Sequence, residues 1–455
     1  MEKLRKNQLV RAVIQGYNSA GMGVARVEDR AVFIPGGARG DAVLLRLLKA
    51  PESGPLFAKI EKLEEPSIAR RQDSCPVTGR CGGCQFRHIS YEEELSLKRV
   101  RVADALRRIG GIELIPDSVL PSSITDAYRN KAVFPVREVQ GRAVTGFYRP
   151  RSHEIVPVDD CPLQNAEANA CARALRNWMN RYRVPAYDEA TGEGLIRHLY
   201  VRTGARSGQA LCCVSATRPR LPQAPALVAA LRGAIPGLTG ILLDFNTRRD
   251  NVLLTGRQRL LWGRDRMEDE LNSLRYFLSV MSFYQVNPIM AEALSDLVVR
   301  MAQLRAQDFV FELYCGVGTL TIPLAQQAAH VVGVDIVQDA IVLARENARI
   351  NGVSNIAFRC ADAGQAVTEM ARGEDRPDVL VVDPPRKGLD RTSVQAIGQL
   401  RPARMVYVSC DPATLARDLK LLHEAADMEI KQCTPLDMFP RTANVECVAQ
   451  LVQKE

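Results

Sequence analysis

The sequence lacks any apolar run long enough to cross a membrane. Its opening residues, MEKLRKNQLVRAVI, also lack the uninterrupted apolar core of a signal peptide. It contains no internal repeat and no low-complexity tract. These absences exclude membrane-spanning and repeat architectures and predict a cytoplasmic protein. Its twelve cysteines are then expected to stay reduced, where metal or catalytic roles are more common than disulfides.

The sequence also lacks a strong excess of positive or negative charge. The chain has 60 Lys and Arg residues against 52 Asp and Glu residues, a net charge of +8. That moderate excess suits a polyanionic partner without requiring one. With 455 residues, 46% of them apolar and 25% charged, the chain has the composition of a soluble protein of two to four domains. Nothing in it indicates an obligate protein partner, so we expect a monomer.

Residues 1–65 alternate short apolar runs with glycine-rich turns, which predicts a small OB-like β-barrel. The expected strands span residues 9–14, 23–27, 31–34 and 42–48. The stretch GMGVARVEDRAVFIPGGARGD resembles the TRAM domain, an RNA-binding barrel found on RNA-modifying enzymes. The resemblance implies that this first domain binds RNA.

Three cysteines follow the barrel with the spacing C-x5-C-x2-C. They are Cys75, Cys81 and Cys84, and two glycines between the last pair allow a tight turn that aims two thiolates at one ion. A fourth soft ligand is needed, and Cys161 is the best candidate because its Cys-Pro dipeptide repeats the one at Cys75. The alternative is a chance group of buried thiols. Spacing alone does not distinguish zinc from an iron–sulfur cluster, since four thiolates serve both.

Residues 66–280 form a second predicted region, a central α+β region that contains these cysteines. Residues 90–111 indicate one helix, capped by Ser90, with acids in its first turn, bases in its last and glycines at its end. Further along, cations and aromatic side chains are interleaved: Arg129, Lys131, Arg137, Arg142, Arg149, Arg151, Arg197, Arg202 and Arg206 with Tyr128, Phe134, Phe147, Tyr148 and Tyr200. Because such a mixture binds the phosphates and splayed bases of single-stranded nucleic acid, this region is predicted to bind RNA.

Strands and helices alternate in residues 281–455, which is typical of an α/β domain with a doubly wound, Rossmann-like sheet. A strand at 309–313 leads into the loop CGVG, and a second strand ends at Asp335. Glycines let the backbone approach a nucleotide, and the acid accepts hydrogen bonds from ribose hydroxyls. The loop is shorter than the G-x-G-x-x-G that holds a pyrophosphate, which favours S-adenosylmethionine as the cofactor.

The segment YVSCDPAT places Cys410 between an apolar strand and an amphipathic helix. Asp411 is suited to cap that helix, and Pro412 is suited to its first turn. The positive end of the helix dipole is expected to lower the pKa of the Cys410 thiol and favour the nucleophilic thiolate. A buried structural cysteine is the alternative, but the cofactor-type loop upstream favours a nucleophile.

A cysteine nucleophile in a methyltransferase has one clear use, because carbon-5 of a pyrimidine is a poor nucleophile. Addition of Cys410 to carbon-6 gives an enolate that takes the methyl group at carbon-5. A base must then remove the carbon-5 proton; the candidate is Glu446 in NVECVAQLV, and the alternative is a surface Glu on an edge strand. Asp383 also ends a strand, but Arg386 stands where amine methyltransferases carry an aromatic residue, which argues against amine methylation.

Five motifs together resemble the RNA (uracil-5-)-methyltransferase family over nearly the whole chain. They are SFYQVNP (282–288), ELYCGVGTLTIPLA (312–325), DPPRKG (383–388), YVSCDPAT (407–414) and LDMFPRTANVE (436–446). The resemblance implies that Cys410 is the nucleophile and Glu446 the base. It also implies a pocket for S-adenosylmethionine and uracil that is lined by Gln285, Tyr314, Asp335 and Asp383, with Asp362 approaching the adenine.

The ribosomal RNA branch of that family carries a TRAM barrel and a four-iron, four-sulfur cluster, and the transfer RNA branch typically lacks both. The positions that match the cluster ligands are Cys75, Cys81, Cys84 and Cys161. The resemblance therefore favours a uridine of 23S ribosomal RNA as the substrate. Two positions depart from the family pattern, because Asn444 replaces a usual His and Arg441 a usual Gln.

Three alternatives stay open at this point. One is a transfer RNA substrate for the same reaction. Another is an RNA-binding or ribosome-assembly protein that has lost turnover, which only Asn444 favours. The third is a radical methylthiotransferase, whose C-x3-C-x2-C motif differs from the spacing in this chain.

Overall fold

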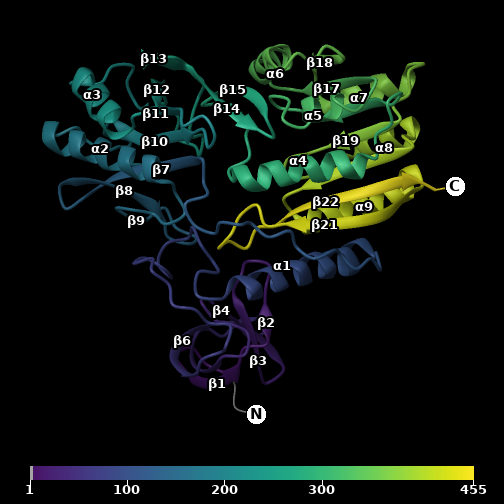
Figure 1. Ribbon diagram of the computed structural model, residues 1–455. Coiled ribbons are helices and arrows are strands. Elements are labelled where there is room, and N and C mark those ends of the chain that lie inside the picture. The colour runs from purple at the N-terminus through teal and green to yellow at the C-terminus, as the bar shows by residue number, and fades with distance from the viewer. Residues whose placement is uncertain (1–3, 455) are drawn as a thin grey trace.

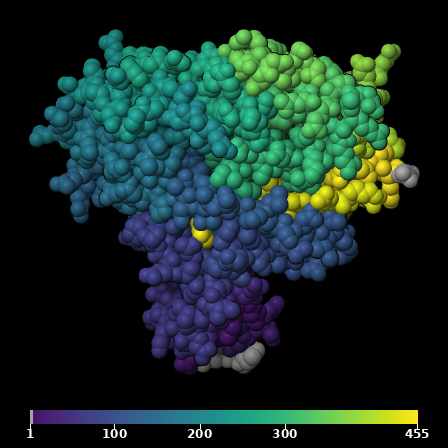
Figure 2. Space-filling model, viewed as in Figure 1, coloured from purple at the N-terminus to yellow at the C-terminus, as the bar shows by residue number. Residues whose placement is uncertain are grey.

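The computed structural model describes residues 4–454, and no helix among them is long and apolar enough to cross a membrane. Figure 1 shows a small barrel at the bottom, a sheet from the middle of the chain at the upper left, and another sheet from the last third at the right. Figure 2 shows the same narrow stem and broad head. It also shows a small patch in the colour of the C-terminus enclosed by the colours of the first third. Distant parts of the chain therefore interlock.

The N-terminal sheet has the order β1-β5-β6-β4-β3-β2, with β1 Leu9–Val13, β2 Gly16–Tyr17, β3 Gly23–Val27, β4 Arg30–Ile34, β5 Ala42–Lys49 and β6 Leu56–Glu65. Its strands alternate apolar and polar residues, so side chains such as Val32 and Leu45 fill one shared core. The four strands expected from the sequence are present. Two further strands were not predicted: β2, which has only two residues, and β6, in which charged residues interrupt the apolar alternation.

Helix α1, Tyr91–Ala105, lies along the lower edge of the C-terminal sheet (Figure 1) and packs on helix α9, Pro412–Ala426. Ser90 caps it by accepting a hydrogen bond from the backbone N–H of Glu93 at 3.2 Å, as predicted. The last turn, Leu106–Gly110, is a π-helix that ends at Gly111 with a φ of 67°. The expected helix is thus confirmed, with a widened final turn.

The central sheet has the order β13-β12-β11-β10-β7-β8-β9, formed by β7 Lys131–Val139, β8 Arg142–Tyr148, β9 Ile155–Pro157, β10 Ile196–Thr203, β11 Ala210–Ala216, β12 Leu238–Phe245 and β13 Gln258–Gly263. Helices α2, Ala166–Tyr182, and α3, Ala224–Ala234, cover one face. The hairpin of β14, Arg266–Leu271, and β15, Leu274–Ser279, packs on the other. Because both faces are covered, all eight residues of β10 are buried.

The C-terminal sheet has the order β18-β17-β16-β19-β20-β22-β21. Its strands are β16 Phe309–Leu313, β17 His330–Asp335, β18 Ile356–Cys360, β19 Val379–Val382, β20 Arg404–Ser409, β21 Met428–Leu436 and β22 Glu446–Gln453. Besides α9, its helices are α4 Pro288–Ala302, α5 Thr321–Ala325, α6 Gln338–Ile350, α7 Ala363–Arg372 and α8 Arg391–Leu400. The first five strands of the order are parallel, and β22 is antiparallel to β20 and β21. The Rossmann-like fold predicted from the sequence is confirmed.

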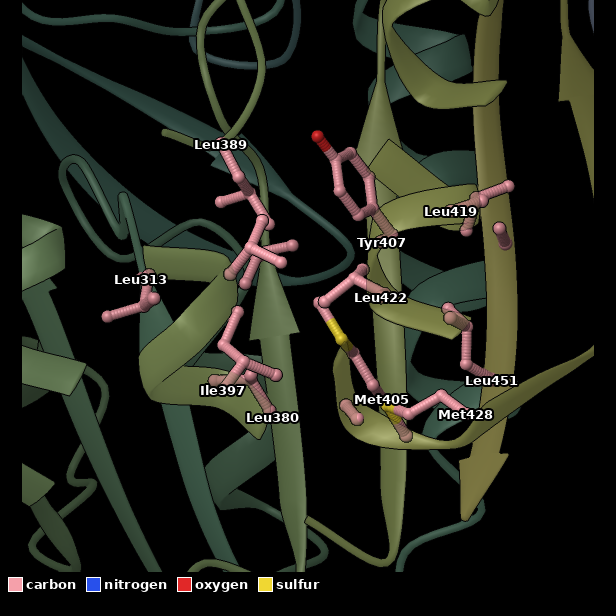
Figure 3. Close-up of a cluster of buried hydrophobic side chains, with 14 of the residues drawn as sticks. Leu313, Leu380, Leu389, Ile397, Met405, Tyr407, Leu419, Leu422, Met428 and Leu451 are labelled. Atoms are coloured by element: carbon pink, nitrogen blue, oxygen red, sulfur yellow. The ribbon is translucent and has the colours of Figure 1, made fainter. Parts of the chain in front are cut away.

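Apolar strands such as VLVV in β19 are buried because helices cover both faces of this sheet. Figure 3 shows the core on one face, where Leu380 and Met405 from the strands meet Ile397 of α8 and Leu422 of α9. The strand order reverses between β16 and β19, and ligands of open α/β sheets bind in the crevice at such a switch point. The fold therefore places a ligand site at the carboxyl ends of these strands.

Candidate functional site

The carboxyl ends of the parallel strands bring most of the predicted site residues to one edge of the sheet. Tyr314 follows β16, Asp335 ends β17, Asp362 follows β18, Asp383 follows β19 and Cys410 follows β20. Glu446 joins them because β22 runs antiparallel to β20, so its first residue lies at the same edge. Ser409 pairs with Cys447, and one further step of that register sets Cys410 opposite Glu446.

Cys410 lies between the end of β20 and the start of α9, as the sequence predicts. Asp411 caps the helix by accepting a hydrogen bond from the backbone N–H of Thr414 at 2.9 Å. The expected lowering of the Cys410 pKa is wrong, because burial raises that pKa and the nearby Glu446 raises it further. The guanidinium of Arg386 acts in the opposite direction and lowers it. Burial of the thiol and the nearby carboxyl group thus act against the lowering expected from the helix dipole.

Two carboxyl groups share the pocket with the thiol. Burial raises the pKa of Asp383 to about 7. The pKa of Glu446 lies well above its usual value, because the side chain is buried and Asp383 is close, while Arg386 opposes that shift. Such a carboxyl group is a stronger proton acceptor than an exposed Glu, which suits general base catalysis near neutral pH.

Gln285, Tyr314 and Asp383 line one cavity beside the glycine loop. Asp335 fixes that loop, because its carboxylate accepts hydrogen bonds from the backbone N–H groups of Gly316 at 3.0 Å and Val337 at 2.8 Å. Asp362 does not line this cavity; it caps α7 by accepting from the backbone N–H of Gln365 at 3.1 Å. The structure therefore brings three of the predicted pocket residues together, with Asp335 acting through the loop.

Sequence reasoning missed Glu312 in this cavity. Its side chain is buried, and its pKa rises to about 8 through burial and through the neighbouring Asp383 and Asp335, although the nearby Thr321 hydroxyl opposes the rise. One of its oxygens, Oε2, has no hydrogen-bond partner in the described chain. The available signal was an acid inside the apolar strand FVFEL, which is rare without a partner.

The loop of residues 437–445 between β21 and β22 presents Glu446, and residues from the first third of the chain hold this loop. Lys98 on α1 donates hydrogen bonds to Glu94 at 2.7 Å and to Asp437 at 2.6 Å, and all three side chains are fully buried. Lys98 also donates to the carbonyl of Phe439 at 3.2 Å. The structure thus buries this basic residue of the helix against the loop.

A second set of bonds ties the same loop to the cysteine-rich segment. The carbonyl oxygen of Arg441 accepts from the backbone N–H groups of Gln85 at 2.9 Å and Phe86 at 3.1 Å. The side chain of Gln85 accepts from the backbone N–H of Ala443 at 3.1 Å and donates to the carbonyl of Gly82 at 3.0 Å. Arg441, one of the two departures from the family pattern, also donates its backbone N–H to Glu94 at 2.7 Å. The loop next to Glu446 is thus fixed from two sides.

Comparison with known proteins gives consistent results. A family model described as tRNA (Uracil-5-)-methyltransferase matches residues 248–454. An uncharacterised RNA methyltransferase of Halalkalibacterium halodurans is 37% identical over 99% of this chain and 98% of its own length. One from Clostridium tetani is 36% identical over 98% of this chain and 96% of its own. This chain belongs to the RNA (uracil-5-)-methyltransferase family.

A solved structure extends the comparison from sequence to fold. The Pyrococcus abyssi tRNA (uracil-54, C5)-methyltransferase, in complex with S-adenosyl-L-homocysteine, is 27% identical and covers 97% of this chain and 100% of its own. Its TM-score is 0.78. The methyltransferase described here is therefore of the S-adenosylmethionine-dependent type, and the cavity at Tyr314 is the candidate position for that cofactor.

The four cysteines predicted to bind a metal, Cys75, Cys81, Cys84 and Cys161, line one cavity of about 70 Å³ in this methyltransferase. None of them is in a disulfide, and burial raises the pKa of Cys84 to about 12 and also that of Cys81 and Cys161. Four half-buried soft donors around one cavity suit a metal group that neutralises thiolates. Across residues 4–454, however, no group of three or more His, Cys, Asp or Glu side chains is arranged to hold a metal ion. The iron–sulfur cluster therefore stays a prediction.

Proposed function

We propose that this methyltransferase transfers a methyl group from S-adenosylmethionine to carbon-5 of a specific uridine in 23S ribosomal RNA. The observation that carries the proposal is the juxtaposition of the Cys410 thiol with the buried Glu446 at one edge of the C-terminal sheet. A thiol and a carboxyl group in one pocket supply the nucleophile and the base that substitution at carbon-5 needs.

In the proposed reaction, the Cys410 thiolate adds to carbon-6 of uracil, and the electron pair of the carbon-5–carbon-6 double bond moves toward the O4 carbonyl. Carbon-5 then forms a bond to the methyl group of S-adenosylmethionine, while the methyl–sulfur bond breaks and its electron pair stays on the sulfur of the product, S-adenosylhomocysteine. Glu446 removes the remaining carbon-5 proton, the double bond forms again, and the bond between carbon-6 and Sγ breaks. Cys410 leaves as the thiolate, and Glu446 carries the proton.

Arg386 has a proposed role in both halves of this reaction. Its guanidinium lowers the pKa of Cys410 and of Glu446, and both values are otherwise raised by burial. A cation near both a thiol and a carboxyl group favours the ionised form of each. For the cofactor side of the pocket we propose the residues Gln285, Tyr314, Asp335, Asp362 and Asp383.

We propose three domains for this work. Residues 1–65 form a TRAM barrel that binds RNA, and residues 66–280 form the cysteine-containing RNA-binding region. Residues 281–455 form the methyltransferase domain. The barrel and the four cysteines support the ribosomal RNA branch. A transfer RNA substrate is the second candidate, and the Pyrococcus abyssi enzyme supports it because its likeness spans the whole chain. An RNA-binding protein without turnover is the third, and only Asn444 favours it.

A trapping experiment with 5-fluorouridine-substituted RNA and S-adenosylmethionine tests the reaction. Fluorine cannot leave carbon-5 as a cation, so we expect a covalent adduct between protein and 23S ribosomal RNA that survives denaturation. Cys410→Ala should give no adduct, and Glu446→Gln should give a lasting adduct even with ordinary uridine. No adduct with wild-type protein that binds both RNA and cofactor would refute the mechanism. An adduct with transfer RNA alone would keep the chemistry and change the substrate.

We also propose that Cys75, Cys81, Cys84 and Cys161 hold a [4Fe-4S] cluster, which would supply no atom to methyl transfer. Iron and acid-labile sulfide, measured on protein purified without air, should be about four each per chain. Cys161→Ser should reduce both contents. Stoichiometric zinc without sulfide would refute the iron–sulfur assignment and keep the cysteines as metal ligands.

A further inference from the structure

The cations that the sequence interleaves with aromatic residues in the central region differ in their partners. Three of them are paired with acids: Arg137 with Glu189, Arg149 with Glu154 and Arg206 with Glu292. Arg197 lies 4.4 Å from the ring of Tyr187 and donates to the carbonyl of Asn246, which is a structural role. A different group, Arg129, Lys131 and Arg202, has neighbours of the same charge.

Lys131 and Arg202 are direct cross-strand neighbours. They occupy paired positions of β7 and β10, so their side chains extend from the same face of the sheet. Like charges directly opposite each other on adjacent strands are destabilising. Burial, Arg202 and Arg129 all lower the pKa of Lys131, to about 8, and no carboxylate of the described chain opposes that shift.

Two guanidinium groups of the cluster have N–H donors without acceptors. Arg202 is 1% exposed, and its Nη2 donates to the Tyr200 hydroxyl at 2.8 Å and to the Ser282 carbonyl at 2.5 Å. Its Nη1 is buried and has no partner in the described residues, and the same is true of Nε of Arg129. A buried donor without an acceptor costs about 1–3 kcal/mol, and more when it is charged. The cluster thus lacks an anion.

The cluster is attached to the motif that lines the catalytic cavity. Asn130, between two of its members, donates its backbone N–H to Val286 and its side-chain amide to the carbonyl of Gln285, both at 2.9 Å. Solvent reaches it, because Lys131 and Arg129 are half-buried and Arg129 also lines a cavity of about 480 Å³. An anion bound here would lie beside the segment that contributes Gln285 to the catalytic cavity.

We propose that Arg129, Lys131 and Arg202 form a subsite for a backbone phosphate of the RNA strand whose uridine enters the active site. This inference rests on the proposed function. A phosphate oxygen accepts from both guanidinium and ammonium groups and removes the repulsion between them. Since the contact is to the backbone, it positions the strand and adds affinity but carries no sequence information.

The test uses Lys131→Gln, with Arg220→Gln as a matched loss of one exposed charge in the same region. The probes are a short fluorescent oligouridylate, titrated at several salt concentrations, and S-adenosylhomocysteine, titrated separately. We expect Lys131→Gln to weaken oligouridylate binding about tenfold and to reduce the slope of log Kd against log salt by about 0.7, the value for one phosphate on a single strand. Lys131→Arg should restore both, and Arg220→Gln should change neither.

The outcomes distinguish a phosphate subsite from a cofactor contact and from a folding defect. Unchanged RNA affinity and an unchanged salt slope in Lys131→Gln would overturn the proposal. Weaker binding of S-adenosylhomocysteine with unchanged RNA binding would also overturn it, because the anion would then be the cofactor carboxylate. Circular dichroism and thermal unfolding of each variant exclude a folding defect as the cause. Failure of the trapping experiment with normal oligouridylate binding would refute the methylation reaction and not the subsite.

Discussion

Two lysines of this chain have opposite surroundings. Lys98 on α1 has acidic neighbours, and Lys131 at the start of β7 has basic neighbours. Lys98 is enclosed by the carboxylates of Glu94 and Asp437, so its charge is neutralised from within the chain. Lys131 faces the guanidinium groups of Arg202 and Arg129, and no carboxylate of the described chain shifts its pKa. A buried charge with partners of its own is part of the architecture, and one without partners indicates a ligand.

The comparison also explains why the two lysines affect different parts of the site. Lys98 fixes the loop of residues 437–445, and this loop ends at Glu446. The cluster that contains Lys131 is attached instead to the segment of Gln285 and Val286. The first lysine therefore acts on the proposed base, and the second on the entry of the RNA.

The largest expected effect comes from Lys98→Met. Removing the ammonium leaves the buried carboxylates of Glu94 and Asp437 facing each other, and the remaining cation, Arg441, lies 3.6 Å from Glu94 alone. Loss of one partner from a buried ion pair typically costs about 3–5 kcal/mol of unfolding free energy. Urea unfolding followed by circular dichroism measures this loss, and Lys420→Met on the exposed side of α9 is the control. A loss no larger than that of the control would show that the network adds no stability.

Lys131→Met should act with the opposite sign. It removes a cross-strand pair of like charges and a desolvated ammonium, so we expect a gain of about 1 kcal/mol in unfolding free energy. The same urea titration measures it, in buffer without phosphate or sulfate. Destabilisation by this substitution would contradict the contrast between the two lysines, because it would mean that the charge of Lys131 stabilises the free protein.

The pH dependence of that gain sharpens the contrast further. The folded-state pKa of Lys131, about 8, lies below its ordinary value of 10.5, so the unfolded chain binds the extra proton between these two values. Wild-type stability therefore rises with pH in this window. The advantage of Lys131→Met should be full below pH 8 and disappear by about pH 10.5. An advantage that stays constant across this range would refute the titration of Lys131.

A smaller effect is expected from Gln85→Ala, which removes one bond of the cysteine-rich segment to the loop and leaves the Lys98 network intact. One hydrogen bond is worth about 1 kcal/mol, so release of the RNA adduct should slow about fivefold. Rapid-quench analysis with ordinary uridine RNA should show the adduct persisting while its formation rate is unchanged. Equal slowing of formation and release would indicate general loosening and not displacement of Glu446.

The sequence predicted the parts of this molecule that depend on local pattern. The strand, glycine loop and helix around Tyr314, and the strand and capped helix around Cys410, follow from apolar runs and turn residues a few positions apart. Burial of Lys98 could not be predicted, because its partner Asp437 lies 339 residues away. The direction of the Cys410 pKa shift depends on Glu446, which a different strand supplies.

The cation cluster shows a similar limit. The richness of the central region in Arg and Lys is visible in the sequence, but several of these residues are neutralised by neighbouring acids in the folded chain. Only the register of β7 against β10 brings Lys131 beside Arg202. The composition of the sequence thus predicts a nucleic-acid-binding region, and the pairing of β7 with β10 shows which of its cations lie together.

The bonds between the first third of the chain and the loop of residues 437–445 have a consequence for biosynthesis. During synthesis α1 and the cysteine-rich segment leave the ribosome early. They lack their hydrogen-bond partners in this loop until the loop itself has emerged. Until then Cys410 lacks Glu446, its proposed base, because β22 has not yet joined the sheet. A nascent chain without β22 therefore lacks the pairing of thiol and carboxyl group on which the proposed turnover depends.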